Sequence, residues 1–161
     1  MEIEVTIRLI LEPITNLPVI VLREQGGQRV LPIWVGAAEF NACELQLENV
    51  ETPRPMTHDL LKQMVEALGG QVERIVVSDL RENTFYATIH LETPRGLVQV
   101  DARPSDAIAL ALRTHSRIFV EESVIQTHRS VEKDRDPQMD IGRLQRWLED
   151  LPDDELGKYK M

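Results

Sequence analysis

The stretch DARPSDAIALALR, residues 101–113, places a strand end, a turn and an apolar helix in direct succession. Pro104 holds φ near the value that a first helical residue needs, and Ser105 or Asp106 could cap the free amides of that turn. Residues 107–112 are apolar on nearly every side, which predicts a helix buried on more than one face. Its alanines permit close approach of another backbone, from the same chain or from a partner.

The segments around this helix alternate between apolar and polar residues and are separated by turn residues, a pattern typical of β-strands. We expect strands at 2–11, 18–24, 28–35, 71–79, 84–92, 97–101 and 117–120. Helical spacing predicts one further helix within AAEFNACELQLENV, residues 37–50. Another is expected at 58–68, with Thr57 as its N-cap and Gly69 and Gly70 at its end.

The chain repeats part of this pattern. When the sequence is displaced by 67 residues, VIVLREQGGQRVLPIWVGAAEFNACEL lies without a gap on YATIHLETPRGLVQVDARPSDAIALAL, and Glu39 falls on Asp106. This correspondence predicts an internal duplication of a unit made of a β-hairpin and a helix. The expected fold class is therefore α+β, with a mixed or antiparallel sheet and helices packed mainly on one face.

Composition and charge narrow the possible functions. The 161 residues, 42% of them hydrophobic, suffice for one domain with a sizeable core, and the single cysteine, Cys43, excludes an internal disulfide. A net charge of -9 disfavours loose binding to nucleic acid, so such an activity would need a local basic patch, a metal ion or a site shared between subunits. Because the N-terminus resembles a strand and no apolar run could span a membrane, we expect a cytoplasmic protein that does not enter membranes.

The composition changes towards the C-terminus, which predicts two parts. Residues 1–128 should form the folded domain. Residues 129–161 should form a polar linker, a short amphipathic helix near 140–149 anchored by Leu144, Trp147 and Leu148, and an acidic tail. Neither part carries an excess of basic residues that would capture nucleic acid.

The opening stretch is the first of two polar clusters that could carry chemistry. Asp101, Arg103 and Asp106 surround the start of an apolar helix, although capping that helix requires only one acid. A structural interpretation stays open, in which Asp106 stabilises the helix dipole and Asp101 forms a local ion pair with Arg103.

The second cluster is PRPMTHDLL, residues 53–61. Arg54 precedes the expected helix, and His58 and Asp59 lie in its first turn. Helix N-termini with nearby arginines bind anions well, because free amides and guanidinium groups both point at phosphate oxygens. The alternative is that His58 is an ordinary surface histidine in a capped helix.

Taken together, four segments of the chain resemble the bifunctional nuclease family, small proteins credited with cleaving both DNA and RNA. These segments are LPIWVGAAEFNA (31–42), PRPMTHDLL (53–61), DLRENTFYATI (79–89) and DARPSDAIALALR (101–113). The resemblance covers roughly residues 1–128, with the motifs in the family's order. It implies a nuclease that hydrolyses phosphodiester bonds of DNA and RNA with low sequence specificity. It also implies a compact α+β domain that self-associates, and a homodimer is our first expectation.

Such hydrolysis needs an oriented water, a base for its proton and positive charge near the phosphate. The catalytic candidates, chosen by chemical type, are Asp101, Asp106, Glu39 and His58, and the phosphate-binding candidates are Arg54 and Arg103. Asp101 and Asp106 could also hold a divalent cation such as Mg²⁺.

Two other functions remain open. The acidic composition favours a non-catalytic, self-associating regulatory or interaction module, in which the polar motifs are architectural. A small-molecule phosphodiesterase would use the same residues in a closed pocket. The informative observation is whether Glu39, His58, Asp101 and Asp106 line one cleft.

Overall fold

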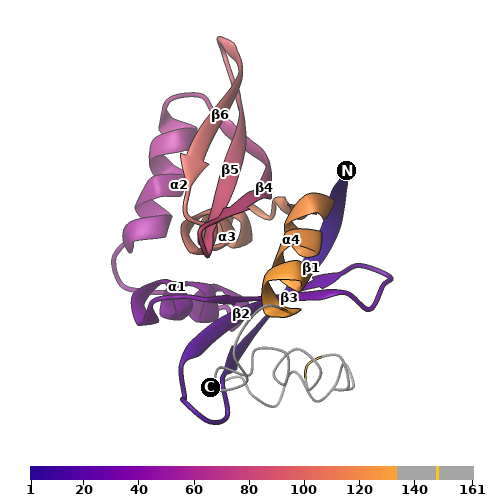
Figure 1. Cartoon of the computed structure of the whole chain (residues 1–161). Helices are drawn as coiled ribbons and strands as arrows, with labels where there is room; N and C mark the ends of the chain where they lie inside the picture. The colour runs from indigo at the N-terminus through magenta and orange to yellow at the C-terminus, as the bar shows by residue number, and fades with distance from the viewer. Residues whose placement is uncertain (134–147, 149–161) are drawn as a thin grey trace.

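Within residues 1–133, seven strands form one mixed sheet in the order β3-β2-β1-β7-β4-β5-β6, and four helices pack against it (Figure 1). The computed structural model describes residues 1–133 and Leu148. The strands are β1 (Glu2–Leu11), β2 (Pro18–Glu24), β3 (Val30–Trp34), β4 (Gln71–Arg81), β5 (Thr84–Thr93), β6 (Gly96–Ala102) and β7 (Arg117–Glu121). The helices are α1 (Ala37–Leu47), α2 (Thr57–Ala67), α3 (Pro104–Thr114) and α4 (Glu122–Lys133). The predicted α+β class and mixed sheet are confirmed.

The strand order follows from short hairpins and one crossover. β1, β2 and β3 are joined in sequence as antiparallel neighbours, and so are β4, β5 and β6. β7 lies between these two groups, antiparallel to β1 and parallel to β4. The chain reaches β7 through α3, because a strand that enters the middle of a sheet needs a crossover connection.

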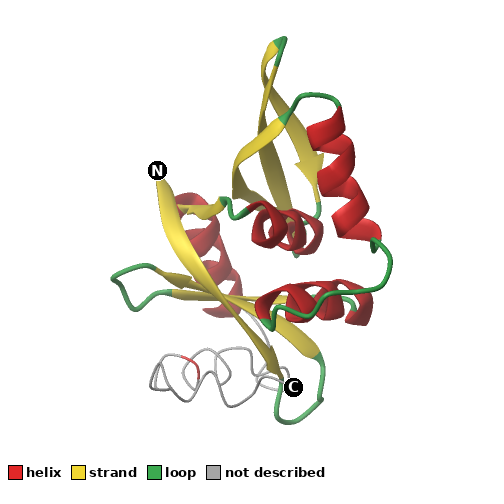
Figure 2. Cartoon of the chain, turned by 180° about the vertical axis from the view of Figure 1, so that it is seen from behind, coloured by secondary structure: helices red, strands yellow, loops and turns green. Residues whose placement is uncertain are grey.

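The principal core lies on one face of the sheet, which we call the inner face. Figure 2 shows the arrangement of the strands and helices from behind. Alternate strand residues such as Ile7, Ile20 and Ala87 point into the principal core, and α1, α3 and α4 add buried side chains. Residues 107–111 of α3 are all buried in this cluster, while α2 packs against α3. The close approach that the alanines permit therefore occurs within this chain.

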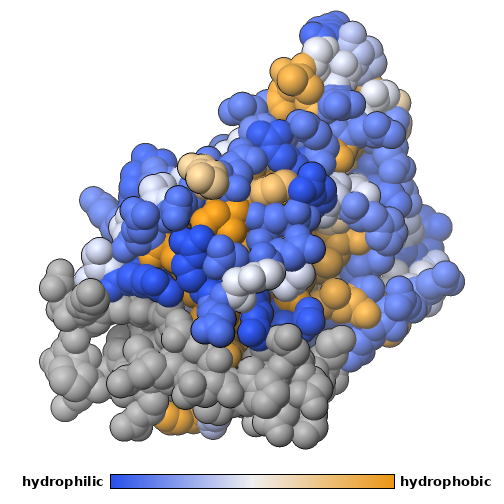
Figure 3. Space-filling view, turned by 90° about the vertical axis from the view of Figure 1, so that its right-hand side faces the viewer, coloured by the Kyte–Doolittle hydropathy of each residue, from blue (hydrophilic) through white to orange (hydrophobic). Residues whose placement is uncertain are grey.

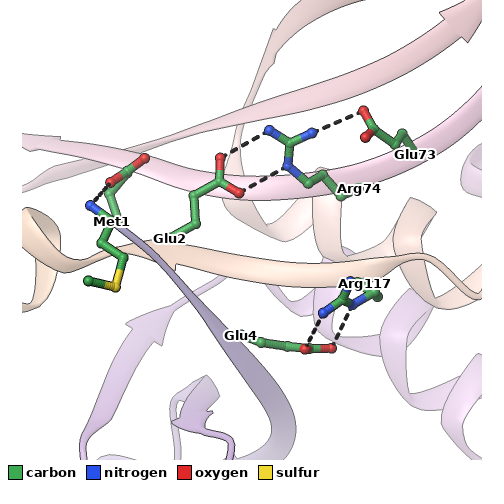
Figure 4. A network of polar contacts seen from close by, with 7 residues as sticks. Met1, Glu2, Glu4, Glu73, Arg74 and Arg117 are labelled. Carbon is green, nitrogen blue, oxygen red and sulfur yellow. Dashed lines mark hydrogen bonds and ion pairs between the residues drawn. The ribbon is translucent and has the colours of Figure 1, made fainter.

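The opposite, outer face of the central strands is polar. Arg74 on β4 bonds Glu2 on β1, and Arg117 on β7 bonds Glu4 on β1 (Figure 4). These pairs cross from strand to strand over the sheet surface, where each contributes little because water screens it. The side of the molecule seen in Figure 3 is mostly hydrophilic, with apolar side chains in small separate groups.

Two predictions of helix capping were wrong. Thr57 is the first residue of α2, and the N-cap is Met56, whose N–H donates to Asp59 at 2.9 Å. The N-cap of α3 is Arg103, and no side chain caps that helix. Asp106 binds other side chains, and Ser105 is buried.

The predicted change to a linker at residue 128 falls inside α4, which continues to Lys133. The division into 1–128 and 129–161 stays a prediction, and the helix expected near 140–149 lies outside the described residues except for Leu148. Leu148 is helical and fully buried. It belongs to a second apolar cluster on the outer face of β1, β2 and β3, with Ile10, Val19, Val21 and Val30. Among the described residues, no helix is long and apolar enough to cross a membrane.

The predicted repeat of a hairpin and a helix is present in the order of the secondary-structure elements. β2, β3 and α1 recur as β5, β6 and α3 at the predicted distance along the chain. The hairpin registers differ, however: Ile20 pairs with Ile33, whereas the equivalent Ala87 pairs with Ala102 and not with Val100. The superposition of the two units, and hence the duplication, stays a prediction.

Candidate functional site

Four of the six predicted site residues lie at the N-terminal ends of three helices. Glu39 is the third residue of α1, His58 the second residue of α2 and Asp106 the third residue of α3. Arg103 is the residue that precedes α3. Helix N-termini carry free amides and a partial positive charge, which stabilise carboxylates placed there.

These four side chains form one continuous network. Arg103 donates from Nη2 to Oε1 of Glu39 and from Nε to Oδ2 of Asp106, each at 2.9 Å. The other oxygen of that carboxylate, Oδ1, lies 2.9 Å from Nε2 of His58. Residues that are 48 and 64 positions apart in the sequence thus meet at one place. We call this set, Glu39, His58, Arg103 and Asp106, the polar network.

The polar network runs from the interior to solvent. The His58 side chain is 9% exposed, whereas the Arg103 side chain is 67% exposed. Hydrogen bonds to Asp106 and then to Glu39 raise the pKa of Arg103, which therefore stays charged. With His58 neutral, the network carries two carboxylates and one guanidinium, so its net charge is negative.

The contact between His58 and Asp106 defines the histidine tautomer. A carboxylate can only accept, so Nε2 of His58 carries the hydrogen that Asp106 binds. In the neutral imidazole the remaining nitrogen, Nδ1, is then the basic one. The dyad can therefore take up a proton at Nδ1 while Asp106 stabilises the resulting cation.

Gly36, the N-cap of α1, makes room for Glu39. A Cβ placed on Gly36 would lie 2.4 Å from Oε2 of Glu39, closer than real contacts allow. The Glu39 carboxylate can fold back over the start of its own helix because this position has no side chain. That placement directs it towards Arg103.

A second set of contacts, which no sequence motif predicts, joins the three helices. The Arg113 side chain is 4% exposed and donates to Oδ1 of Asp59 at 2.7 Å. It also donates to the backbone oxygens of Ala109, in α3, and Ala42, in α1. The only signal in the sequence for Arg113 is its place in the last turn of the expected helix, where a cation is favourable. Its partners in the other two helices come from the tertiary fold.

Asp59 adjoins His58, so its contacts hold the turn that carries the histidine. Burial raises the pKa of Asp59. Hydrogen bonds from the Met56 N–H and from Arg113 lower the pKa, and their combined effect is larger, so the net shift is downward. Asp59 therefore remains a carboxylate that pairs with Arg113. The nearby Cys43 is buried, and burial raises the pKa of its thiol to about 12, so the thiol stays protonated and inert.

Asp101 lies away from the polar network. On β6 it pairs with Thr88, and the next residue, Ala102, pairs with Ala87, which points into the principal core. Because side chains alternate along a strand, Asp101 occupies the outer face of the sheet. Within the described part of the chain it makes no ion pair, so the structural interpretation in which it pairs with Arg103 is wrong.

Arg54 also lies outside the network. It lines a cavity of about 590 Å³ between the end of α1 and the first turns of α2. Other lining residues include Val50, Met56, Lys62 and His115. His58 and Arg54 thus occupy different sides of the start of α2, although they are only four positions apart.

The predicted cation ligands do not form one site in this arrangement. Asp101 is on the outer face, whereas α3, which carries Asp106, packs on the inner face. Glu39 and Asp106 already share Arg103. Among residues 1–133 and Leu148, no three His, Cys, Asp or Glu side chains come together in a group that could hold a metal ion.

Comparison with known proteins adds a family relationship. The bifunctional nuclease domain family matches residues 20–133. An uncharacterized protein of Mycobacterium tuberculosis is 46% identical over 110 residues, which cover 68% of this chain and 65% of that protein. Bifunctional nuclease 2 of Oryza sativa subsp. japonica is 32% identical over 125 residues, covering 73% of this chain and 38% of that protein. Bifunctional nuclease 1 of Arabidopsis thaliana is 32% identical over 100 residues, 60% of this chain and 31% of that protein. The chain thus spans less than two thirds of each relative.

Proposed function

Since the chain belongs to the bifunctional nuclease domain family, we propose that it hydrolyses phosphodiester bonds of DNA and RNA with low sequence specificity. The observation that carries the proposal is the contact between His58 and Asp106, with Arg103 bound to the same carboxylate. A histidine held by a carboxylate beside an exposed guanidinium supplies a base and a phosphate ligand in one place.

In the proposed reaction, Nδ1 of His58 accepts a proton from water while the water oxygen attacks phosphorus. The bond from phosphorus to the leaving oxygen then breaks, and that oxygen takes a proton from the imidazolium. Asp106 keeps the imidazole in the required tautomer and stabilises its cation. Arg103 offers its solvent-facing N–H groups to the phosphate oxygens, and Glu39 orients that guanidinium.

The net negative charge of the polar network opposes the approach of a phosphate. Arg103 and the three helix N-termini offset part of this repulsion. A requirement for a divalent cation such as Mg²⁺ stays a prediction, and no step of the proposed reaction passes through one. Asp101 and Arg54 lie outside the polar network, so the proposed reaction does not use them. The catalytic role of Asp101 and the phosphate-binding role of Arg54 stay predictions.

The test is a cleavage assay on single- and double-stranded DNA and RNA, with and without a chelator. His58→Gln should lower the cleavage rate by about 10²–10⁴-fold, the usual contribution of a general acid or base. His90→Gln is the matched control, because His90 lies on β5 on the outer face and should leave the rate unchanged. Wild-type protein that cleaves none of the substrates, or a His58→Gln variant that cleaves normally, would refute the proposal.

The alternative, a non-catalytic interaction module, is favoured by one observation. Both carboxylates of the polar network are already neutralised in part by Arg103, as they would be in a purely architectural contact. On this alternative, His58→Gln should lower the melting temperature while the wild-type protein shows no cleavage. The two readouts together separate the hypotheses.

A further inference from the structure

The described part of the structure contains a cavity that the proposed reaction does not use. Its volume is about 590 Å³, within the roughly 300–1,000 Å³ of sites that hold small organic molecules. Three segments surround it: the end of α1 with the loop that joins α1 to α2 (Figure 1), the first turns of α2, and the C-terminal end of α3. None of the four residues of the polar network lines it.

A basic side chain reaches this cavity from each of the three segments. Arg54 belongs to the loop, Lys62 to α2, and His115 is the C-cap of α3. The buried Arg113 also lines the cavity. With His115 neutral, the three cations balance the three carboxylates of the lining, whereas the whole chain carries a net charge of -9. An anion is therefore repelled less here than over the average surface of the protein.

Ion pairing occupies most of the charged groups of the cavity but leaves two basic groups available. Asp59 bonds Arg113 at 2.7 Å, and Glu66 lies 3.9 Å from Lys62. Within residues 1–133 and Leu148, the side chains of Arg54 and His115 form no ion pair, and Glu51, the third lining carboxylate, is exposed in the same loop and is not paired with Arg54. Arg54 and His115 can thus bind an added anion without breaking an existing pair.

The backbone holds both of these groups in place. The hydroxyl of Thr52 donates to the backbone oxygen of Arg54 at 2.8 Å. His115 has a φ of 54°, in the left-handed region where a helix normally ends with glycine. The next amide, of Ser116, donates to the backbone oxygen of Ala111 at 2.9 Å and closes the end of α3. The chain therefore carries an imidazole at a position where glycine would be less strained.

The cavity also has an apolar part. Leu45, Val50 and Met56 line it, together with Pro53 and Pro55. Val50 is 48% exposed and Met56 is 38% exposed, so a ligand could remove more of their apolar surface from water. A ligand that matches this lining has an anionic group at one end and an apolar or planar group at the other.

We propose that this cavity binds a phosphate monoester, with its phosphate on Arg54 and His115 and its organic group against Val50 and Met56. A phosphate monoester carries nearly two negative charges at pH 7 and three acceptor oxygens, so it can bind basic groups from two segments at once. A carboxylate has one charge and two oxygens and matches this arrangement less well. Because the polar network lies outside the cavity, this binding is independent of the nuclease activity proposed above.

The first test is isothermal titration calorimetry of the full chain with two probes, adenosine 5′-monophosphate and phenyl phosphate. At least one of them should bind with a Kd below about 1 mM. Adenosine and phenol, which lack the phosphate, and inorganic phosphate, which lacks the organic group, should each bind about tenfold more weakly or worse, because each loses one half of the contacts. Failure of both esters to bind, or equal binding of the molecules that lack one half, would overturn the proposal.

The second test locates the phosphate, with thermal melts as the check on folding. Arg54→Gln should raise the Kd of the ester by about tenfold or more, the usual effect of losing a hydrogen bond to a charged group. His115→Asn should also raise it, and asparagine tolerates the left-handed backbone of this position. Arg103→Gln is the matched control, because Arg103 is the exposed arginine of the polar network, and this variant should bind like the wild-type protein. Weaker binding by Arg103→Gln with unchanged binding by Arg54→Gln would place the phosphate at the polar network and overturn the proposal.

Discussion

Asp101 and Asp106 stand five residues apart, yet the fold gives them unlike surroundings. Asp106 binds Arg103 and His58 at the start of α3, whereas Asp101 is exposed on the outer face of β6. The turn at Pro104 separates a strand residue from a helix residue, so the two carboxylates leave the backbone on different sides of the sheet. Only Asp106 is held by partners that could support chemistry.

This difference predicts the behaviour of Asp101→Asn. Because Asp101 forms no ion pair within the described residues, the change should alter the free energy of unfolding by less than about 0.5 kcal/mol. Urea denaturation measures the stability, and the cleavage assay then tests the proposed catalytic role. A loss of several kcal/mol would show that Asp101 has a structural partner, while normal cleavage would remove it from the proposed site.

Asp59 predicts a dependence of stability on pH. Its pKa is lowered in the folded protein, so its contribution is fully present above the unfolded-state pKa of about 3.9 and is lost as pH falls through the lower folded-state value. The difference in unfolding free energy between wild type and Asp59→Asn should therefore be constant from about pH 7 to pH 5 and shrink below about pH 4. Denaturation curves across this range test it, and a difference that grows in acid would contradict it.

At the scale of elements, three helices are tied together by one buried cation. Arg113 in α3 reaches the carboxylate of Asp59 in α2 and the backbone oxygen of Ala42 in α1. Seven residues earlier on the same helix, Asp106 holds His58. The first turn of α2 is thus attached to α3 at two points, which keeps the histidine at the polar network.

Arg113, within α3, and Arg103, the N-cap of α3, should differ in how much they contribute to the free energy of unfolding. Arg113→Met should lower the free energy of unfolding by about 1–3 kcal/mol, because it leaves the half-buried Asp59 carboxylate without its buried partner. Arg103→Met should cost less than about 1 kcal/mol, because the Arg103 side chain is largely exposed. Chemical denaturation of both variants measures the contrast. Equal costs would mean that burial does not distinguish the two ion pairs.

At the scale of the whole molecule, the sheet has different partners on its two faces. The inner face carries the principal core, which draws its buried residues from positions 5–125. The outer face is polar over the centre of the sheet and apolar over β1, β2 and β3, where Leu148 packs. The C-terminal part of the chain thus contributes to a cluster that is separate from the principal core.

A truncation should reveal this separation. The chain that ends at residue 133 should still melt cooperatively, because the principal core remains complete. It should be less stable than the full chain, and Leu148→Ala alone should cost about 2–5 kcal/mol, the usual range for a buried leucine. Calorimetry of the three proteins measures these effects. Loss of the cooperative transition would show that the principal core depends on the residues after 133.

Much of the fold could be predicted from the sequence because its signals are local. Alternation of apolar residues and turn residues placed the seven strands, and the displacement by 67 residues anticipated the recurrence of a hairpin and a helix. The apolar run after Pro104 predicted that α3 would be buried. Helix caps were less accurate, because Asp59 binds the Met56 amide and thereby starts α2 one residue before the expected position.

The composition of the candidate site was only partly predictable, since it depends on contacts between distant residues. The chemical types of Glu39, His58, Arg103 and Asp106 could be read from the sequence, and three of them mark helix starts. Their meeting, and the exclusion of Asp101, were decided by the packing of three helices on one face of the sheet. Side-chain direction relative to a sheet depends on register and on which face the helices cover, and neither is encoded within a single short motif.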